Sequence, residues 1–506
     1  MYWIRRRVVS MSHSHEIYES YLESVSMVQQ QIDSYNRFIH IGLNKIVESQ
    51  NTIEPDVANF AIKFKGIRLE MPKVIESDSS TRSILPHEAI SRNLTYAAPM
   101  YITYVPVIAG IEKSNNTGEA YVGDLPVMVK SELCYTRNMT REQLLSEDED
   151  PDDPGGYFII KGTERVLVGI EDLAPNKLMA TKEGNTTVSK VFSTTTSFRA
   201  RCSVERNEYG IFTVNFPTVS KGLELAMIVR ALGLTKEDML KFDNEDVKND
   251  MLLNLAVSKA ADMSPAEAIM ELGRFSAPSQ AKAYQQKRAE TQLDTYILPH
   301  IGVTPKSRKE KGMYLLRMAE RSSMVAYGYA KPDDKDHYGN KRVKLAGDLM
   351  EELFNNSFRF FIKDIKYHVE RTTARGRRLN VRTNINPDTL TEKILYSMGT
   401  GSWPAGQTGV SEVLERTNIL STLAHLRRVK SPLAKKHPHL RARDVHGTHI
   451  GKLCPTETPE GVVVGLTRYL AVMAKVTVGA DQDTLIKKLD TLGDMDSKDR
   501  VEREKQ

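Results

Sequence analysis

The amino-acid sequence predicts a multidomain protein of the α+β class, and three observations support this prediction. The chain has 506 residues, which is enough for two to four domains. Residues 60–112 and 176–220 contain segments that alternate apolar and polar side chains and are rich in β-branched and aromatic residues, as is typical of strands. Residues 15–50, 221–300 and 342–373 instead carry apolar residues at helical spacing.

The N-terminal part is expected to begin with one or two amphipathic helices within residues 15–50. Strands are predicted at 60–71 and 97–112, where the alternation has a period of two. An acidic run at 147–153 then precedes a proline and two glycines. A metal site is one interpretation of these carboxylates. A solvated loop is favoured, because adjacent like charges without helical or strand spacing rarely converge on one ion.

The middle of the chain is expected to form a module of its own. Residues 176–220 are β-rich, with a turn at 207–210, and the helical pattern of 221–300 follows directly. We therefore expect an inserted β-then-α block. The strongest helical pattern comes later, at 342–373, and predicts core packing rather than a cofactor-binding face. The apolar residues on one face of this expected helix are Leu345, Leu349, Leu353, Phe358, Ile362 and Ile365.

Composition restricts the class of protein and its location. The net charge is only +5, so a polyanion site has to come from local clustering of Lys and Arg. Three cysteines are too few for a disulfide framework or a four-cysteine zinc site, which suits a reducing, cytoplasmic location. Residues 1–9 lack the apolar core of a signal peptide, although Met11 is an alternative start. The apolar residues 462–478 are interrupted by charges, so no membrane span is expected.

Several kinds of catalytic and metal site are disfavoured by the motifs. The sequence contains no GxxxxGK[ST] phosphate loop, and no GxSxG elbow or dinucleotide fingerprint follows a predicted strand. His446, His449 and Cys454 have the spacing H-x2-H-x4-C, which suggests zinc. A structural zinc site needs four ligands, so packing and hydrogen-bonding histidines are the favoured interpretation.

Residues 427–461 join a dense cationic stretch to a rigid turn that carries acids. Two prolines, Pro432 and Pro438, exclude a continuous helix in the stretch. Cations on a bent loop suit a phosphate backbone, whereas base recognition needs a presented helix or strand platform. The cationic stretch contains no acid, and its Lys and Arg residues are Arg427, Arg428, Lys430, Lys435, Lys436, Arg441 and Arg443.

The turn that follows presents Glu457 and Glu460 beside a proline and a glycine. Two functional interpretations remain open from the residues alone. The segment is either an active site with its own carboxylates or a channel wall that binds a polyanion beside a partner's active site. A solvated face without function is the plain alternative for any run of charges.

Long motifs along the chain carry a resemblance to a known family. In chain order they are GGYFIIKGTERVLV, DDKDHYGNKRVKLAGDLMEELF, TGSWPAGQTGVSEVLERTNILSTLAHLRRVKSPL and RARDVHGTHIGKLCPTETPEGVVVGL. Residues 15–478 resemble the N-terminal half of the second-largest subunit of multisubunit DNA-directed RNA polymerases. The sequence ends just past the fork region of that family. It is therefore similar to the N-terminal piece, B double-prime, of the archaeal subunits that are divided between two genes.

The resemblance implies an order of domains. Residues 15–175 and 335–395 would form the protrusion, 176–334 the lobe and 396–478 the fork region. Residues 479–506 would be a charged C-terminal tail. The implied lobe agrees with the inserted β-then-α block expected from the residue pattern.

The resemblance also implies the activity and the partners. The chain would be one subunit of a nucleotidyltransferase, inactive alone, because two-metal phosphoryl transfer needs converging aspartates and the sequence offers no credible trio. Mg²⁺ would be held by the largest subunit, and no cofactor is expected on this chain. The implied partners are the C-terminal half of the split subunit (B prime), the largest subunit, other polymerase subunits, template DNA and nascent RNA.

The implied site follows from the same resemblance. The cations of 427–443 would hold phosphates of the RNA–DNA hybrid and of downstream DNA. Glu457 and Glu460 would lie near the incoming nucleotide and the RNA 3′ end and orient basic side chains; for Glu457 a wholly structural role is equally open. Two alternatives are kept: a basic nucleic-acid-binding scaffold that works without a polymerase, and a truncated form of an undivided polymerase subunit.

Overall fold

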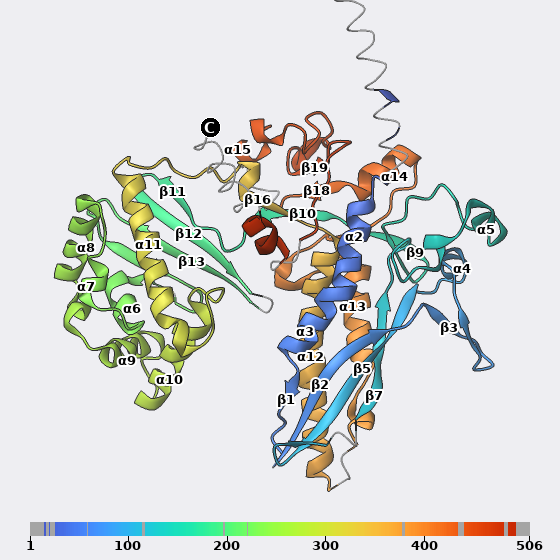
Figure 1. Cartoon of the computed structure of the whole chain (residues 1–506), viewed down its shortest axis with the longest axis horizontal. Coiled ribbons are helices and arrows are strands. Elements are labelled where there is room, and N and C mark those ends of the chain that lie inside the picture. Colours follow the sequence, from blue (N-terminus) through green and yellow to red (C-terminus); the bar gives the residue numbers. More distant parts are fainter. Residues whose placement is uncertain are drawn as a thin grey trace, which may run out of the picture. The chain divides into compact units, whose positions relative to one another are not determined.

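The computed structural model describes residues 15–16, 20, 26–57, 59–113, 117–195, 198–219, 221–376, 380–433, 440–479 and 484–491. The chain divides into two compact units (Figure 1). The first unit comprises Met1–Glu171 and Val343–Gln506, and the second comprises Asp172–Arg342. Each unit contains both sheets and helices, so the multidomain α+β class predicted from the sequence is confirmed.

The first unit is built on a five-stranded antiparallel sheet. Its order is β1-β2-β5-β6, with β7 paired to the other part of β5. Side chains along β5 alternate between buried and more exposed positions, because only one face of the sheet is covered. The strands predicted at 60–71 and 97–112 are thereby confirmed. The bounds are β1 Thr52–Ile53, β2 Phe60–Leu69, β5 Ala97–Ile108, β6 Ile111–Glu112 and β7 Gly118–Pro126.

Four helices cover the inner face of this sheet and each other, as Figure 1 shows. They are α2 (Gln29–Arg37), α3 (Leu43–Ser49), α12 (Ala346–Ala374) and α13 (Asp388–Thr400). α12 is the long helix predicted from the apolar stripe, and the side chains of Leu349, Phe358 and Ile365 on that stripe have no exposed surface. The core of the first unit therefore lies between α12 and the sheet.

The crossing of α12 over α2 requires a glycine. A Cβ atom on Gly347 would lie 1.9 Å from the carbonyl oxygen of Ser34, so no other residue permits this approach. The N–H of Gly347 donates to Ser34 Oγ at 3.0 Å, and the N–H of Ala346 donates to Gln31 Oε1 at 3.0 Å. These bonds satisfy amide groups in the first turn of α12 that have no partner within the helix.

The acidic run at 147–153 forms a turn and a loop, as predicted. It follows α5 (Arg141–Ser146), whose N-terminus is closed by a capping box of Thr140 and Gln143. Arg141 pairs with Asp152 at 2.8 Å, and Glu149 accepts the backbone N–H of His87 at 2.7 Å. Asp152 and Glu149 are thus engaged by different neighbouring groups.

Two small sheets contain strands from the segment around the cationic stretch. In one, β17 (Ser411–Val413) adds to the hairpin of β8 (Phe158–Ile160) and β9 (Thr163–Leu167). In the other, with order β16-β10-β18-β19, β18 (Arg428–Lys430) pairs in parallel with β10 and antiparallel with β19. The remaining bounds are β3 Lys73–Ile75, β4 Thr81–Ser83, β10 Gly169–Leu173, β16 Lys341–Lys344, β19 Thr467–Tyr469, α4 Pro86–Ser91, α14 Ile419–Leu426 and α15 Leu440–Arg443.

The second unit has strands first and helices after them, in the order predicted for the inserted block. Its five strands form an antiparallel meander in chain order, and α11 packs on β11, β12 and β13. The strands are β11 Met179–Glu183, β12 Thr186–Thr194, β13 Arg199–Arg206, β14 Phe212–Asn215 and β15 Leu223–Glu224. The helices are α6 Leu225–Ala231, α7 Lys236–Met239, α8 Glu245–Val257, α9 Pro265–Ser276, α10 Lys282–Thr291 and α11 Arg308–Ala326. Within the described ranges, no helix of either unit is long and apolar enough to span a membrane.

Candidate nucleic-acid interface

The first cations of the cationic stretch meet carboxylates of the same unit. Arg428 donates through Nη1 to Glu412 Oε2 at 3.2 Å and through Nη2 to Glu415 Oε1 at 3.0 Å. Lys430 lies two residues further along β18, on the same face, and donates to Glu412 Oε1. β17 therefore places one carboxylate between two cations of β18.

His425 completes this group from α14, and its side chain is only 1% exposed. Its Nδ1 accepts the backbone N–H of Glu415 at 3.1 Å, which leaves the ring proton on Nε2, 3.3 Å from Glu412 Oε2. Burial raises the pKa of Glu412, but hydrogen bonds from His425 and Lys430 outweigh burial and lower the pKa from 4.5 to about 2. We call His425, Glu412, Glu415, Arg428 and Lys430 the Glu412 cluster.

The side chain of Arg427 is buried and holds two segments of the backbone together. It is 7% exposed, and its guanidinium donates to four backbone carbonyl oxygens: Met27 at 2.5 Å, Ala471 at 2.6 Å, Val472 at 3.1 Å and Ala474 at 3.4 Å. A side chain that satisfies carbonyls from two distant segments links the residues just before α2 to the residues after β19. The Arg427 guanidinium therefore uses its donors for hydrogen bonds within the first unit.

Arg443 is bound at the other end of the stretch. Its Nη1 donates to the carbonyl oxygens of Val462 and Val464, each at 2.8 Å. Gly465 permits this approach, because at its φ of +69° a Cβ atom would lie 2.3 Å from the Arg443 carbonyl oxygen. Arg441, in contrast, is exposed on α15 and has no ion pair within the described ranges. Lys435 and Lys436 lie outside the described residues.

The acidic turn places both predicted glutamates at the surface. Glu457 and Glu460 are exposed. Burial raises the pKa of Glu457, and the nearby charges of Arg428 and Arg427 oppose that rise. Thr458 holds the turn, since its Oγ1 donates to the carbonyl oxygen of Thr467 and accepts from the N–H of Gly465, both at 3.0 Å. Both glutamates thus lie at the surface on a turn whose backbone is fixed by a threonine.

The structure also reveals a cationic surface that sequence reasoning missed. A groove of about 860 Å³ in the first unit is lined by Lys161 and Arg165 from the β8–β9 hairpin, Phe360 from α12, and Lys393 and Tyr396 from α13. Phe360 is 44% exposed and Tyr396 is 66% exposed, and Lys393 Nζ lies 4.1 Å from the centre of the Phe360 ring. We call this site the cationic groove.

The charge of the cationic groove is not balanced internally. Within the described part of the chain, neither Lys161, Arg165 nor Lys393 forms an ion pair, and Glu392 is the single carboxylate among the lining residues. In the structure, Lys393 and Tyr396 are three residues apart on α13 and therefore share one face of that helix. What no local pattern shows is that this helix face meets the β8–β9 hairpin.

The cationic groove and the Glu412 cluster are joined through one small sheet. Arg165 in β9 pairs with Val413 in β17, the residue next to Glu412. Successive side chains of a strand point to opposite faces, so Arg165 and Glu412 lie on opposite faces of this sheet. Arg416, just after β17, donates to both oxygens of Glu164 at 2.8 Å and 2.7 Å and fixes the connection.

Comparisons with known proteins agree with the sequence motifs. Residues 26–392 match the family described as RNA polymerase beta subunit, and residues 412–476 match RNA polymerase Rpb2, domain 3. The chain is 41% identical over 494 residues to DNA-directed RNA polymerase subunit Rpo2N of Methanocaldococcus jannaschii, which covers 96% of this chain and 99% of that relative. It is 39% identical over 492 residues to Rpo2N of Halobacterium salinarum, with 93% and 94% covered.

A longer relative fixes the place of the chain within the subunit. The chain is 40% identical over 485 residues to subunit Rpo2 of Saccharolobus solfataricus, covering 94% of this chain and 43% of that relative. The chain belongs to the Rpo2N family. It corresponds to the N-terminal half of the second-largest subunit of archaeal DNA-directed RNA polymerase. The predicted family is confirmed, and Rpo2N is a subunit of the enzyme that transcribes DNA, which removes the alternative of a scaffold without a polymerase.

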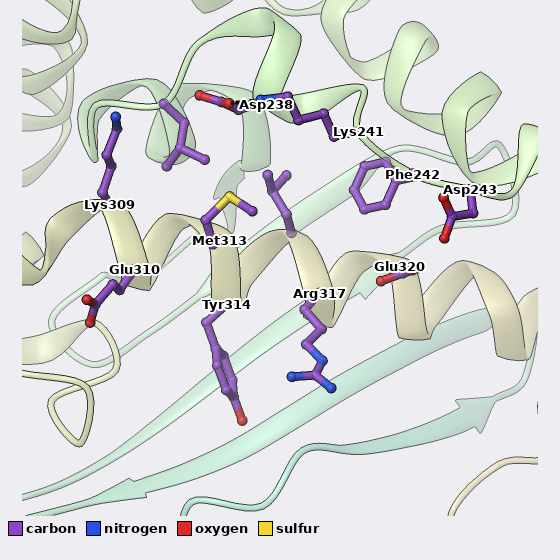
Figure 2. Close-up of a pocket in the computed structure, with 12 residues that line it drawn as sticks. Asp238, Lys241, Phe242, Asp243, Lys309, Glu310, Met313, Tyr314, Arg317 and Glu320 are labelled. Carbon is purple, nitrogen blue, oxygen red and sulfur yellow. Dashed lines mark hydrogen bonds and ion pairs between the residues drawn. The ribbon is translucent and has the colours of Figure 1, made fainter.

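A groove in the second unit has a different character from the cationic groove. Figure 2 shows it along α11, where Met313 points toward the opposite wall and Phe242 lies near Asp243. Its volume is about 820 Å³. Acids and bases alternate around it, with Asp238 and Lys241 paired at 2.8 Å. Such a balanced rim does not suit a polyanion.

The histidines that suggested zinc are engaged in local hydrogen bonds. His446 Nδ1 lies 2.7 Å from Thr448 Oγ1, and His449 Nδ1 accepts the backbone N–H of His446 at 3.3 Å. Within the ranges that the structure describes, no group of three or more His, Cys, Asp or Glu side chains could hold a metal ion. The residues of this region therefore fix a turn through hydrogen bonds.

Proposed function

We propose that this Rpo2N chain forms part of the wall that holds DNA and RNA during transcription. It would assemble with a C-terminal half, Rpo2C where the subunit is split, and with the largest and other polymerase subunits in the cytoplasm. The protrusion (15–175 and 335–395), the lobe (176–334) and the fork region (396–478) belong to this proposal. Support comes from the family matches over 26–392 and 412–476 and from Rpo2N relatives of nearly the same length.

The observation that carries the proposal is the unbalanced charge of the cationic groove. Lys161, Arg165 and Lys393 converge there beside the exposed rings of Phe360 and Tyr396. Cations track a phosphate backbone by releasing its condensed counterions, and exposed aromatic rings stack on bases without regard to sequence. A polymerase needs such sequence-independent binding, because it moves along every template.

The cationic stretch divides into anchors and binders in this proposal. Arg427 and Arg443 donate hydrogen bonds to backbone carbonyls, and Arg428 and Lys430 donate to the Glu412 carboxylate. These contacts fix the stretch to the first unit at its described ends. Phosphates of the hybrid and of downstream DNA would then be bound by the three cations that remain, which are Lys435, Lys436 and Arg441.

Catalysis would be supplied by the assembled enzyme. The catalytic Mg²⁺ would be held by the largest subunit and would supply electrostatic stabilisation for phosphoryl transfer there. Glu457 and Glu460 would lie near the incoming nucleotide and orient basic side chains. Their exposure on a turn fixed by Thr458 supports a role toward a ligand.

The test of the proposal is the salt dependence of assembled elongation complexes. Arg165→Gln and Lys393→Gln should each speed dissociation on every template sequence. Each should also reduce the slope of log affinity against log salt by about 0.7 to 0.9 for a lost phosphate contact. Lys366→Gln is the matched control, since Lys366 is an exposed cation on α12 that pairs with Glu370 at 3.9 Å. Slopes equal to those of the control would refute a nucleic-acid role for the cationic groove.

A further inference from the structure

We propose that the second unit binds one nucleotide unit, a phosphate joined to a planar base, in a small pocket beside α10. The pocket has a volume of about 340 Å³. Tyr284, Lys287, Arg288 and Thr291 line it from α10, Tyr296 lines it from the helical turn Gln292–Tyr296 that directly follows, and Thr218 lines it from the segment after β14. We call it the α10 pocket. The argument rests on these residues alone and does not depend on the proposed function of the first unit.

The first step concerns charge. Lys287 and Arg288 are adjacent and exposed, and neither forms an ion pair within the described ranges. They share one face of α10 with Tyr284 and Thr291, because residues three, four and seven apart lie on the same side of a helix. None of the described residues that line the α10 pocket carries a carboxylate. An arginine fork and a lysine without competing acids are suited to a phosphate group.

The second step concerns the aromatic rings. Tyr284 is 50% exposed, so one face of its ring is available to a ligand. Tyr296 is held in place, because its ring meets the ring of Phe198 edge-on at a centroid distance of 5.3 Å. An available ring next to a fixed ring favours a ligand with a planar group. A base that stacks on tyrosine is the planar group that accompanies a phosphate in a nucleotide.

The third step concerns the backbone at Thr218. Its φ is +79°, a strained conformation for a β-branched residue. Gln292, which is 2% exposed, holds it there by donating from Nε2 to Thr218 Oγ1 at 3.0 Å. Gln292 is fixed in turn, since its Oε1 accepts from Ser276 Oγ at 2.6 Å. The Thr218 hydroxyl accepts from Gln292 and keeps its own proton to donate to a ligand oxygen.

The test is a calorimetric titration of the full-length chain with ATP, without Mg²⁺ and at constant salt. In the double variant Lys287→Gln/Arg288→Gln the affinity for ATP should fall about tenfold to a hundredfold, because charge-assisted hydrogen bonds are lost. Lys282→Gln is the matched control, since Lys282 is an exposed cation of the same helix and does not line the α10 pocket. The control should bind ATP as tightly as the wild type.

Two further measurements identify the ligand. If the base stacks on the tyrosine ring, Tyr284→Leu should lower the affinity for ATP about tenfold and leave the affinity for inorganic pyrophosphate unchanged. An oligothymidylate that binds more tightly than ATP, with the same dependence on Lys287 and Arg288, would assign the nucleotide unit to a single strand, and the reverse order would assign it to a free nucleotide. Absence of ATP binding, or equal binding by the double variant and the Lys282→Gln control, would overturn the proposal.

Discussion

Glu412→Gln tests whether the first cations of the cationic stretch serve the fold or the ligand. The Glu412 carboxylate accepts hydrogen bonds from Arg428 at 3.2 Å, from His425 at 3.3 Å and from Lys430. Glutamine keeps the size of the side chain and one oxygen acceptor. It removes the negative charge and places an amide NH₂ group against cations. We therefore expect this single change to destabilise the first unit.

The size of the effect follows from the pKa of Glu412. A fall from 4.5 to about 2 corresponds to roughly 3 kcal/mol at 1.36 kcal/mol per unit. The side chain is 29% exposed, so solvent screening reduces this figure. We expect Glu412→Gln to lower the free energy of unfolding by about 2 kcal/mol at pH 7.

The pH dependence has a definite sign. The pKa of Glu412 is lower in the folded chain than in the unfolded chain, so its contribution is complete above pH 4.5 and disappears as the pH falls toward 2. The difference between the wild type and Glu412→Gln should therefore shrink over that range. A difference independent of pH would mean that packing, and not charge, is responsible.

Urea unfolding followed by tryptophan fluorescence can measure this difference. The chain has two tryptophans, at positions 3 and 403, so no tryptophan lies in the second unit. Trp403 is 4% exposed and donates to the carbonyl oxygen of Leu349 at 3.0 Å, so it reports on the core of the first unit. Glu415→Gln is the matched control, because Glu415 is 46% exposed and should contribute less than about 1 kcal/mol. Equal effects of the two substitutions would refute the reasoning.

Three further outcomes are expected. Lys435→Ala and Lys436→Ala should each lower the slope of log affinity against log salt for assembled elongation complexes by about 0.7 to 0.9. Unchanged slopes would mean that these lysines belong to a solvated face and contact no phosphate. Glu460→Gln should change the rate of single-nucleotide addition while the lifetime of the complex in salt stays the same; a shortened lifetime would contradict this. Gly347→Ala should destabilise the first unit by more than about 2 kcal/mol in the fluorescence assay, since its Cβ atom would lie 1.9 Å from the Ser34 oxygen.

Much of the fold was accessible from the sequence because it depends on local periodicity. α12 extends from Ala346 to Ala374, close to the predicted 342–373, because one stripe of apolar side chains is buried along most of its length. The strands β2 and β5 were predicted for the same reason. The contact of α12 with α2 was inaccessible, because Gly347 and Ser34 are 313 residues apart and no pattern within either helix refers to the other.

The candidate site was only partly accessible, because charge in a sequence does not show which partner neutralises it. Arg427, Arg428 and Lys435 look equivalent as members of one basic run. In the fold, Arg427 binds backbone carbonyls, which every residue carries, and Arg428 binds Glu412, which lies in a different strand. The cationic groove was missed for the complementary reason, since Arg165 and Lys393 are isolated cations until the fold brings them together.

The balanced and unbalanced cations of the first unit have distinct physical consequences. A cation that is already paired, such as Arg428 with Glu412 and Glu415, must exchange its carboxylates for a phosphate, so little net electrostatic free energy remains for binding. A cation without an ion pair, such as Arg165, would release counterions from a bound nucleic acid with no such exchange. In the proposed channel wall, paired cations would therefore fix the geometry, and unpaired cations would supply the affinity for nucleic acid. By this argument the salt dependence of the assembled polymerase should follow the unpaired set, and its thermal stability should follow the Glu412 cluster.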